Sequence, residues 1–351
     1  MPDTTATTDQ PSHSGSKPHL KSLSEQVVVI LGASSGIGRE TALRCAAKGA
    51  RVVVAARSEP GLDSLAAEIA ASGGQAIVVP CDVTDIAQVE QVAVAAVEAF
   101  GRIDTWVNVA SVSVYATFEE ISLEEFRRIL DVNLMGYVHG AKVALPHLRQ
   151  GGGGALIVIS SVEGSVALPL HSAYAAAKHA TEGLVDALRR ELMAEGVSIS
   201  VTSIKPASIN TPFFNNSRSK MGVKPQGAPP IYEPGIVAQC VLYAATHPVR
   251  DLYAGGAGKA LAITQIVAPG VLDKALARFG IPAQQTDEPA STNDALETPR
   301  LEEDRVHGDS SNQARGFSLY TWLETHPAAT RATGAVVAGY LALRLLGQQR
   351  H

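Results

Sequence analysis

Short runs of hydrophobic residues alternate along the chain with longer stretches in which hydrophobic positions recur at helical spacing. The runs of strand length are Val27–Leu31, Val52–Ala56, Ile77–Val79, Ile103–Val109, Leu156–Ile159 and Ile199–Ile204. The amphipathic stretches between them are Gly38–Lys48, Leu62–Ser72, Ile86–Phe100, Leu123–Arg149 and Ala173–Glu195. Continuous hydrophobic strands that alternate with helices are typical of a parallel sheet buried on both faces. The pattern therefore predicts an α/β fold with a doubly wound parallel sheet, and Ala260–Thr264 as a candidate last strand.

The composition changes along the chain and predicts four segments. Residues 1–22 are rich in Thr, Ser, Asp and Pro, and we expect a disordered leader without the apolar region of a signal peptide. Residues 23–280 form the predicted domain, with helices continuing at Gly235–Thr246 and Val267–Arg278. Inside it, 210–234 is polar and irregular, as expected of a loop that covers a site. Residues 281–316 are predicted to be a polar linker, and 317–351 a tail.

The tail contains the apolar stretch Thr325–Leu346, which is bracketed by Arg331 and Arg344. Its apolar core is shorter than the roughly 18 residues expected of a spanning helix, although terminal arginines can extend the span. Three interpretations stay open: a membrane anchor, a helix that docks on the domain or on an oligomer partner, and a frayed extension.

Charge and cysteine content exclude several classes of function. The net charge is -5 and no block of like charge occurs, so a nucleic-acid surface is not expected. The three cysteines lie far apart, which predicts no disulfide framework and a reducing, cytoplasmic environment. The ten histidines form no metal motif, and we expect no metal site.

A glycine-rich turn follows the first predicted strand. It reads Gly32-Ala-Ser-Ser-Gly36-Ile-Gly38 and leads directly into a helix. Glycines allow the backbone to turn tightly and to approach a pyrophosphate, and the helix N-terminus offers free N–H groups. The turn predicts a dinucleotide site formed by Gly32, Ser34, Ser35, Gly36, Ile37 and Gly38.

The end of the second strand bears on the choice of cofactor. Enzymes that use NAD place a carboxylate here for the ribose 2′-hydroxyl, whereas this chain has Ala56 followed by Arg57. A guanidinium binds a 2′-phosphate by charge-assisted hydrogen bonds. The sequence therefore favours NADP(H) over NAD(H).

Tyr174 and Lys178 stand four residues apart on a predicted helix and so share one face. Reduction of a carbonyl requires a proton donor for oxygen, and a nearby cation lowers the pKa of a tyrosine. The preceding strand ends in Ser160-Ser161, where a hydroxyl points into the crevice of such sheets. Ser161, with Ser160 as the alternative, is a candidate for binding the substrate oxygen, and Asn133 for positioning a water.

With these motifs in this order, the chain resembles the short-chain dehydrogenase/reductase family from about Leu23 to Thr264. The resemblance implies a Rossmann-like fold, a catalytic tetrad at Asn133, Ser161, Tyr174 and Lys178, and a ribose contact from Lys178. It also implies cofactor contacts at Asp82, Val83, Asn108, Ala110, Pro206, Ile209 and Thr211. The chain departs from two segments of the family, which read NNAG and PG. Val109 replaces the second Asn of NNAG, Ser111 replaces its Gly, and Ala207 replaces the Gly of PG. These departures affect backbone beside the cofactor and remove no proton donor.

Glu163–Ser172 and the 210–234 loop are expected to flank the reacting group. Both are largely apolar, which suits an apolar ketone, aldehyde or alcohol, with Glu163, His171 and Phe213 as candidate lining residues. The sequence thus predicts an NADP(H)-dependent oxidoreductase that acts on a small molecule and forms a homo-oligomer, as relatives do. The alternatives are an NAD-dependent alcohol dehydrogenase, and a membrane-tethered nucleotide-binding scaffold without turnover.

Overall fold

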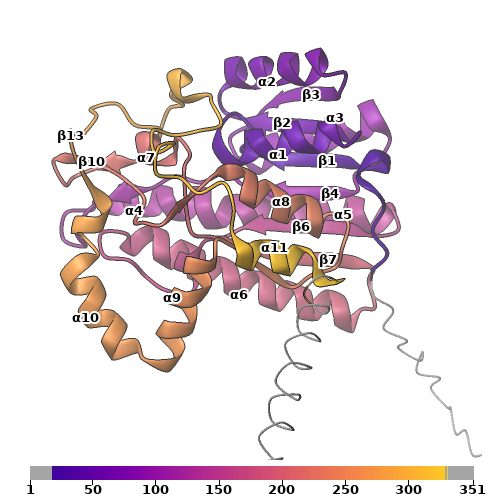
Figure 1. Ribbon diagram of the computed structural model, residues 1–351. Helices are drawn as coiled ribbons and strands as arrows, with labels where there is room; N and C mark the ends of the chain where they lie inside the picture. Colours follow the sequence, from indigo (N-terminus) through magenta and orange to yellow (C-terminus); the bar gives the residue numbers. More distant parts are fainter. Residues whose placement is uncertain (1–17, 329, 331–351) are drawn as a thin grey trace, which may run out of the picture.

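The computed structural model describes residues 18–328 and residue 330. A seven-stranded parallel sheet forms its centre, in the order β12-β7-β6-β4-β1-β2-β3 (Figure 1). The strands predicted from sequence are present as β1 (Val27–Leu31), β2 (Arg51–Ala56), β3 (Gln75–Pro80), β4 (Thr105–Asn108), β6 (Gly154–Ile159) and β7 (Ile199–Pro206). Every residue of β1, β4, β6 and β7 is buried, as continuous hydrophobic runs require. The predicted Rossmann-like, doubly wound sheet is confirmed.

Helices cover both faces of the sheet. One face is covered by α1 (Gly36–Ala47), α2 (Glu59–Ala71) and α8 (Pro234–Ala244). The other face is covered by α3 (Ile86–Phe100), α5 (Gly136–Gln150) and α6 (Ser172–Ala194), with α4 (Leu123–Leu130) beside them. A π-helical turn at Asp131–Met135, η2, joins α4 to α5. The two hydrophobic cores therefore lie between the sheet and each helical layer.

Short elements gather beside the carboxyl ends of the strands. They are β5 (Val114–Tyr115), η3 (Val162–Gly164), β8 (Ser208–Ile209), α7 (Phe213–Asn216), β9 (Arg218–Ser219), β10 (Val223–Pro225) and β11 (Ile231–Tyr232). One further short helix, η1 (Leu23–Glu25), precedes β1 at the opposite edge of the sheet. The predicted 210–234 loop thus contains α7, β9, β10 and β11. Pairing of β9 with β5 and of β11 with β8 ties this loop to the rest of the domain.

The candidate last strand at Ala260–Thr264 is wrong. The last strand of the sheet is β12 (Asp251–Ala254), which pairs with Ser203–Pro206 of β7. Ala260–Thr264 lies within α9 (Gly256–Val267), which is followed by α10 (Pro269–Phe279). The buried residues of α9 are Gly258 and Ala262, four positions apart, so its burial follows a helical period rather than that of a strand.

The segment predicted to be a linker is packed against the domain. It contains η4 (Pro282–Gln284), β13 (Gln285–Pro289) and η5 (Leu301–Glu303), and α11 (Leu319–Thr325) follows it. β13 pairs with β10, and α11 lies beside α8 and β12 (Figure 1). The Thr321 hydroxyl donates a 3.0 Å hydrogen bond to the Tyr253 carbonyl oxygen. Most of the predicted leader and of the apolar stretch Thr325–Leu346 lies outside the described residues.

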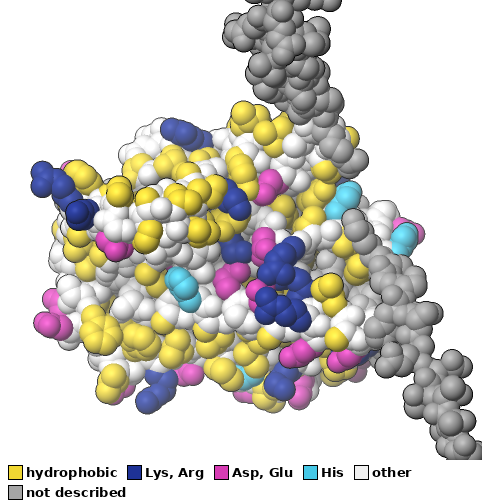
Figure 2. Space-filling model, turned by 90° about the horizontal axis from the view of Figure 1, so that it is seen from below, with side chains coloured by type: hydrophobic (Ala, Val, Ile, Leu, Met, Phe, Trp, Pro, Cys, Tyr) yellow, Lys and Arg dark blue, Asp and Glu magenta, His cyan; other side chains and the backbone are white. Residues whose placement is uncertain are grey.

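Seen from below, the molecule exposes hydrophobic side chains among charged ones (Figure 2). α9 and α10 expose several large ones, namely Ile263, Ile266, Val267, Val271 and Phe279. None of the helices formed by residues 18–328 has the length and hydropathy needed to cross a bilayer.

Candidate active site

A cavity of about 260 Å³ opens at the carboxyl ends of the central strands. It is lined by the turns that follow β1, β2, β3, β4, β6 and β7, and by part of the C-terminal segment. The carboxyl ends of parallel strands are where such sheets bind ligands. Most of the residues predicted from sequence to form a site line this one cavity.

The glycine turn after β1 has the geometry expected of a phosphate loop. Gly32 has a φ of 93° and Gly36 a φ of 54°, which are left-handed conformations that favour glycine. Gly38 packs so closely that an added Cβ would lie 2.0 Å from the Gly32 carbonyl oxygen. Gly32, Ser34, Ser35, Gly36 and Ile37 line the cavity, and α1 begins at Gly36. Gly38 does not line it but holds α1 against the turn.

Tyr174 and Lys178 share the first turns of α6 and both line the cavity. The Lys178 Nζ donates hydrogen bonds to the Ile159 carbonyl oxygen at 3.0 Å and to the Tyr137 hydroxyl at 3.2 Å. It lies 5.4 Å from the centre of the Tyr174 ring. The structure therefore brings the predicted pair into one site.

The pKa of Tyr174 differs from the sequence expectation. Burial raises it well above its usual value, and the charge of Glu163 raises it further, while the Ser161 and Ser111 hydroxyls lower it. Burial lowers the pKa of Lys178 to about 7, against the opposing effect of Glu182 and Glu163. The expected lowering of the Tyr174 pKa by the neighbouring lysine is therefore not found, because burial is the largest effect on this phenol.

The low pKa of Lys178 predicts a pH dependence of stability. Folded Lys178 releases its proton near pH 7, whereas an unfolded lysine keeps it until about pH 10.4. Between these values the unfolded chain binds more protons, so stability rises with pH. In urea denaturation, the unfolding free energy of the wild type relative to Lys178→Met should rise over this range, by up to about 1.4 kcal/mol per pH unit.

Lys142→Met is the matched control, because Lys142 is an exposed lysine of α5. The difference between this variant and the wild type should stay flat over the same pH range. A flat difference for Lys178→Met as well would show that Lys178 is not a buried titrating group.

Ser160 and Ser161 both line the cavity. The Ser161 hydroxyl accepts a 3.0 Å hydrogen bond from the Glu163 N–H and lowers the pKa of Tyr174. The Ser160 hydroxyl is buried without a partner, and an added Cβ on Gly164 would lie 3.0 Å from it. Its influence on Tyr174 makes Ser161 the better candidate of the two for binding a substrate oxygen.

Asn133 and Asn108 do not present their side chains to the cavity. The Asn133 side chain is fully buried and exchanges two 2.9 Å hydrogen bonds with the backbone of Val112. Asn108 accepts a 3.1 Å hydrogen bond from the Trp106 indole, and its own amide nitrogen has no partner. Both side chains brace the turns behind the site, and the Asn133 amide is not free to contact a ligand in the cavity.

The other residues expected at the cofactor do line the cavity. These are Asp82, Val83, Ala110, Pro206, Ile209 and Thr211, together with Arg57. The Asp82 carboxylate pairs with the Arg128 guanidinium at 3.2 Å and accepts hydrogen bonds from the backbone N–H and the hydroxyl of Thr84. Burial acts to raise the pKa of Asp82, but the bonds from Thr84 and the charge of Arg128 outweigh burial and lower it.

His171 and Glu163 form a buried pair beside Tyr174. The His171 Nδ1 and Glu163 Oε1 atoms lie 2.8 Å apart, and the His171 Nε2 is buried without a partner. The His171 ring lies between those of Tyr115, at 4.1 Å, and Tyr174, at 5.4 Å. Phe213 packs on the other side of Tyr174, with ring centres 5.7 Å apart. The predicted lining residues are therefore brought together around the phenol.

Sequence reasoning missed one whole wall of the cavity. Ala295, Pro299, Arg300 and Asp304 line it, although they come from the segment expected to be a linker. The residues next to them in the sequence are mostly polar, and their hydrophobic positions do not recur at the spacing of a helix or a strand. The sequence therefore contained no signal that this segment packs on the site. Tyr115 was also missed, because β5 is only two residues long.

Comparison with known proteins agrees with this geometry. Residues 26–222 match the family model described as short chain dehydrogenase. The chain is 37% identical over 331 residues to the uncharacterized oxidoreductase YxnA of Bacillus subtilis, covering 92% of this chain and 91% of that protein. It is 36% identical over 262 residues to dehydrogenase/reductase SDR family member 7B of Bos taurus, covering 72% and 80%.

A solved structure is similar as well. It is an alcohol dehydrogenase from the archaeon Thermococcus sibiricus complexed with 5-hydroxy-NADP, with a TM-score of 0.57 and 28% identity. The match covers 65% of this chain and 95% of that one. With the family model matching more than half of its length, the chain belongs to the short-chain dehydrogenase/reductase family of oxidoreductases.

Proposed function

We propose that this protein interconverts a carbonyl compound and an alcohol, with Tyr174 as the general acid and base and NADP(H) as the preferred cofactor. The observation that carries the proposal is a buried phenol in the cavity, beside the Ser161 hydroxyl and close to the Lys178 Nζ. Family membership supports oxidoreductase chemistry, and the cavity residues supply the groups that it needs.

Each polar group has a distinct task in this proposal. Tyr174 is protonated at neutral pH, as a general acid must be, but burial raises its pKa, so the transfer of its proton needs a stabilising charge nearby. Ser161 orients the substrate oxygen toward the phenol by a hydrogen bond. Lys178, when protonated, places a positive charge beside the phenol and favours the phenolate that remains after the proton has left.

The residues around the glycine turn fit a nicotinamide dinucleotide. Gly32 and Gly36 adopt left-handed conformations and line the cavity, so backbone can approach a pyrophosphate there, while Gly38 lets α1 pack closely against the turn. Asp82, Val83 and Ala110 would hold the adenosine half, and Pro206, Ile209 and Thr211 the nicotinamide half. When bound, the nicotinamide supplies or accepts the hydride.

The preference for NADP(H) rests on the end of β2. The strand ends at Ala56 rather than at a carboxylate, and the next residue, Arg57, lines the cavity. Arg57→Ala should weaken NADPH binding about tenfold to a hundredfold, as expected for the loss of charge-assisted hydrogen bonds, and leave NADH binding within about threefold. Fluorescence titration of the purified variant measures both dissociation constants. Equal weakening for both cofactors would refute a 2′-phosphate contact.

An apolar substrate is supported by the walls around Tyr174. Phe213, Phe214 and Leu168 line this end of the cavity, and apolar walls of this kind suit an apolar ketone, aldehyde or alcohol. The His171 Nε2 is the polar exception. We propose that it faces a second polar atom of the substrate, or the mouth of the site.

A nucleotide-binding scaffold without turnover is the rival function. It would bind the dinucleotide but would not need Tyr174, Ser161 and Lys178 at one cavity. The wild type, incubated with NADPH and a panel of apolar aldehydes and ketones, should yield alcohol in proportion to the NADPH consumed. Tight binding of both NADPH and NADH without product from any carbonyl would favour the scaffold.

From the sequence we further propose that the protein forms a homo-oligomer, that it is located in the cytoplasm, and that its tail contacts a membrane. The exposed apolar residues of α9 and α10 support an additional contact surface. Size-exclusion chromatography with light scattering tests the first proposal, and cell fractionation tests the other two.

A further inference from the structure

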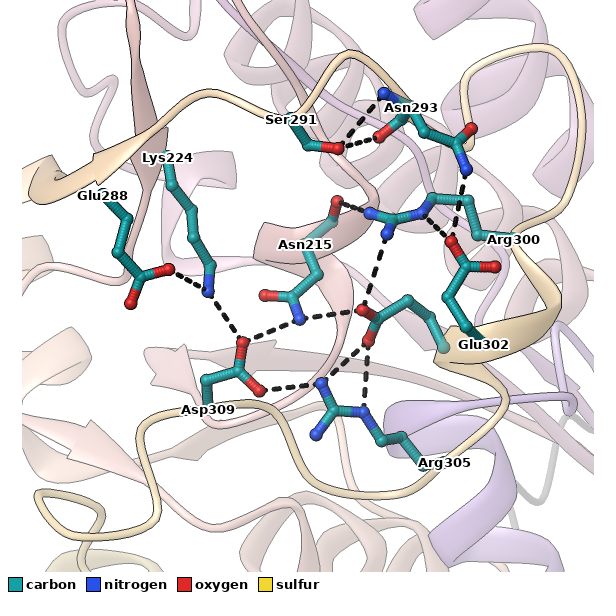
Figure 3. A network of polar contacts seen from close by, with 10 residues as sticks. Asn215, Lys224, Glu288, Ser291, Asn293, Arg300, Glu302, Arg305 and Asp309 are labelled. Carbon is teal, nitrogen blue, oxygen red and sulfur yellow. Dashed lines mark hydrogen bonds and ion pairs between the residues drawn. The ribbon is translucent and has the colours of Figure 1, made fainter.

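Residues 290–311 cross the cavity as a strap. An ion pair and hydrogen bonds fasten the strap to the loop that carries α7 and β10 (Figure 3). Lys224 binds Asp309 at 2.8 Å and Glu288 at 2.9 Å, and Arg300 donates a 2.6 Å hydrogen bond to the Asn215 carbonyl oxygen. Within the strap itself, the Arg305 guanidinium pairs with the Asp309 carboxylate at 2.7 Å. The strap is therefore held in one position rather than lying free on the surface.

The strap places a carboxylate against the phosphate loop. The Ser58 hydroxyl donates a 2.5 Å hydrogen bond to the Asp304 carboxylate, and the nearby Ser34 side chain acts to lower the pKa of this carboxylate. Gly61 allows the approach, because an added Cβ there would lie 2.3 Å from the Asp304 Cγ. Asp304 thus sits between the turn after β1 and the start of α2.

Other donors of the same region are also occupied by oxygen atoms of the strap. The Arg57 guanidinium donates to the carbonyl oxygens of Ala295 at 2.6 Å and Glu297 at 2.7 Å. The Gly36 N–H, at the first residue of α1, donates a 2.9 Å hydrogen bond to the Arg305 carbonyl oxygen. A phosphate could accept hydrogen bonds from the same donors.

We propose that Asp304 is an internal competitor of the 2′-phosphate of NADP(H) and so determines the cofactor selectivity of this site. The inference rests on the proposed function, because it assumes that a nicotinamide dinucleotide binds in the cavity. The Asp304 carboxylate accepts a hydrogen bond from Ser58; burial raises its pKa, while Ser58, Ser34 and the charge of Arg39 act to lower it. When ionised, this carboxylate repels a second anion at the same place. NADP(H) must displace Asp304, whereas the 2′-hydroxyl of NAD(H) donates to a carboxylate without repulsion.

Either dinucleotide must displace the Arg305 carbonyl oxygen from the Gly36 N–H, and this cost is common to NADPH and NADH. Asp304, Arg300 and Pro299 line the cavity, and the space continues past them to Tyr174 and Lys178. The strap therefore acts at the adenosine end and leaves the reacting end open. Arg57 attracts a 2′-phosphate and Asp304 opposes it, so the balance of these two side chains sets the preference.

The test compares Asp304→Asn with the wild type, in the full chain, by fluorescence titration with NADPH and NADH. The amide removes the charge at nearly constant shape, and we expect NADPH to bind at least about tenfold more tightly. NADH binding should stay within about threefold. Asp304→Ala, which also removes the side-chain oxygens, should change the selectivity in the same direction, and circular dichroism confirms that each variant is folded.

Glu302→Gln is the matched control, because it removes the same charge two residues away. Glu302 is exposed and pairs with Arg300 at 2.9 Å, outside the phosphate-binding donors. Its charge acts on Asp304 only from a distance and is exposed to solvent, so the NADPH affinity of this variant should rise by less than about threefold. An equal gain in Glu302→Gln, or an unchanged ratio of NADPH to NADH affinity in both Asp304 variants, would overturn the role of Asp304 while leaving the proposed function in place. Failure of the wild type and all variants to bind either dinucleotide would instead overturn the proposed function.

Discussion

Replacing Tyr174 by Phe is expected to lower the kcat of carbonyl reduction by about 10²- to 10⁴-fold, which is the usual contribution of a positioned general acid. The change removes only the hydroxyl group and leaves the ring packed against His171 and Phe213. Affinity for the dinucleotide should therefore stay within about threefold of the wild type, so the loss appears in kcat. Steady-state kinetics together with a binding titration separates the two effects.

Tyr115→Phe is the control for this prediction. Tyr115 is a second buried tyrosine on the same cavity wall, and its ring packs on His171 rather than beside Ser161 and Lys178. We expect its kcat to fall by less than about tenfold, which is smaller than the loss of a general acid. Wild-type turnover in Tyr174→Phe would mean that another group delivers the proton. The next candidate would then be His171, whose ring centre lies 5.4 Å from that of Tyr174.

Replacing Gly38 by Ala is expected to weaken dinucleotide binding by more than about a hundredfold. The added methyl group would lie 2.0 Å from the Gly32 carbonyl oxygen and 2.8 Å from its carbonyl carbon. Both are backbone atoms, so the turn itself must move away from α1, and the closely packed phosphate loop is lost. Overpacking of this kind also destabilises the fold by about 1–3 kcal/mol.

Gly183→Ala gives the matched control on another helix. Gly183 lies within α6, and nothing stands within 4 Å of an added Cβ. Alanine is the better helix former, so this variant should gain up to about 1 kcal/mol and bind the dinucleotide normally. Titration and thermal denaturation compare the two variants. Normal binding by Gly38→Ala would contradict the assignment of this turn as the phosphate loop.

The sequence was informative where local pattern decides the structure. Buried strands such as Val27–Leu31 are continuous hydrophobic runs, and the glycine turn follows the first of them directly. Tyr174 and Lys178 could be placed together because a helix fixes their spacing. The last strand was misplaced because Asp251–Ala254 is short and its partner β7 lies far away in sequence.

The strap could not be predicted, for a different physical reason. Its position depends on pairs between distant residues, such as Lys224 with Asp309 and Arg300 with Asn215. A polar segment with such partners has the same composition as a free linker. The contacts of the Asn133 side chain could not be predicted for the same reason, because its partner is the backbone of Val112, which no sequence pattern marks.

The transfer of deuterium tests the central claim most directly. NADPH that carries deuterium at the transferred position of its nicotinamide ring is mixed with the wild type and an apolar carbonyl compound from the panel, and the product is analysed by mass spectrometry and NMR. If the chain is the oxidoreductase proposed here, the label appears on the carbinol carbon, in proportion to the NADPH consumed, and Tyr174→Phe forms almost none of this product. Consumption of NADPH that leaves the alcohol unlabelled, or equal labelling by Tyr174→Phe, would contradict it.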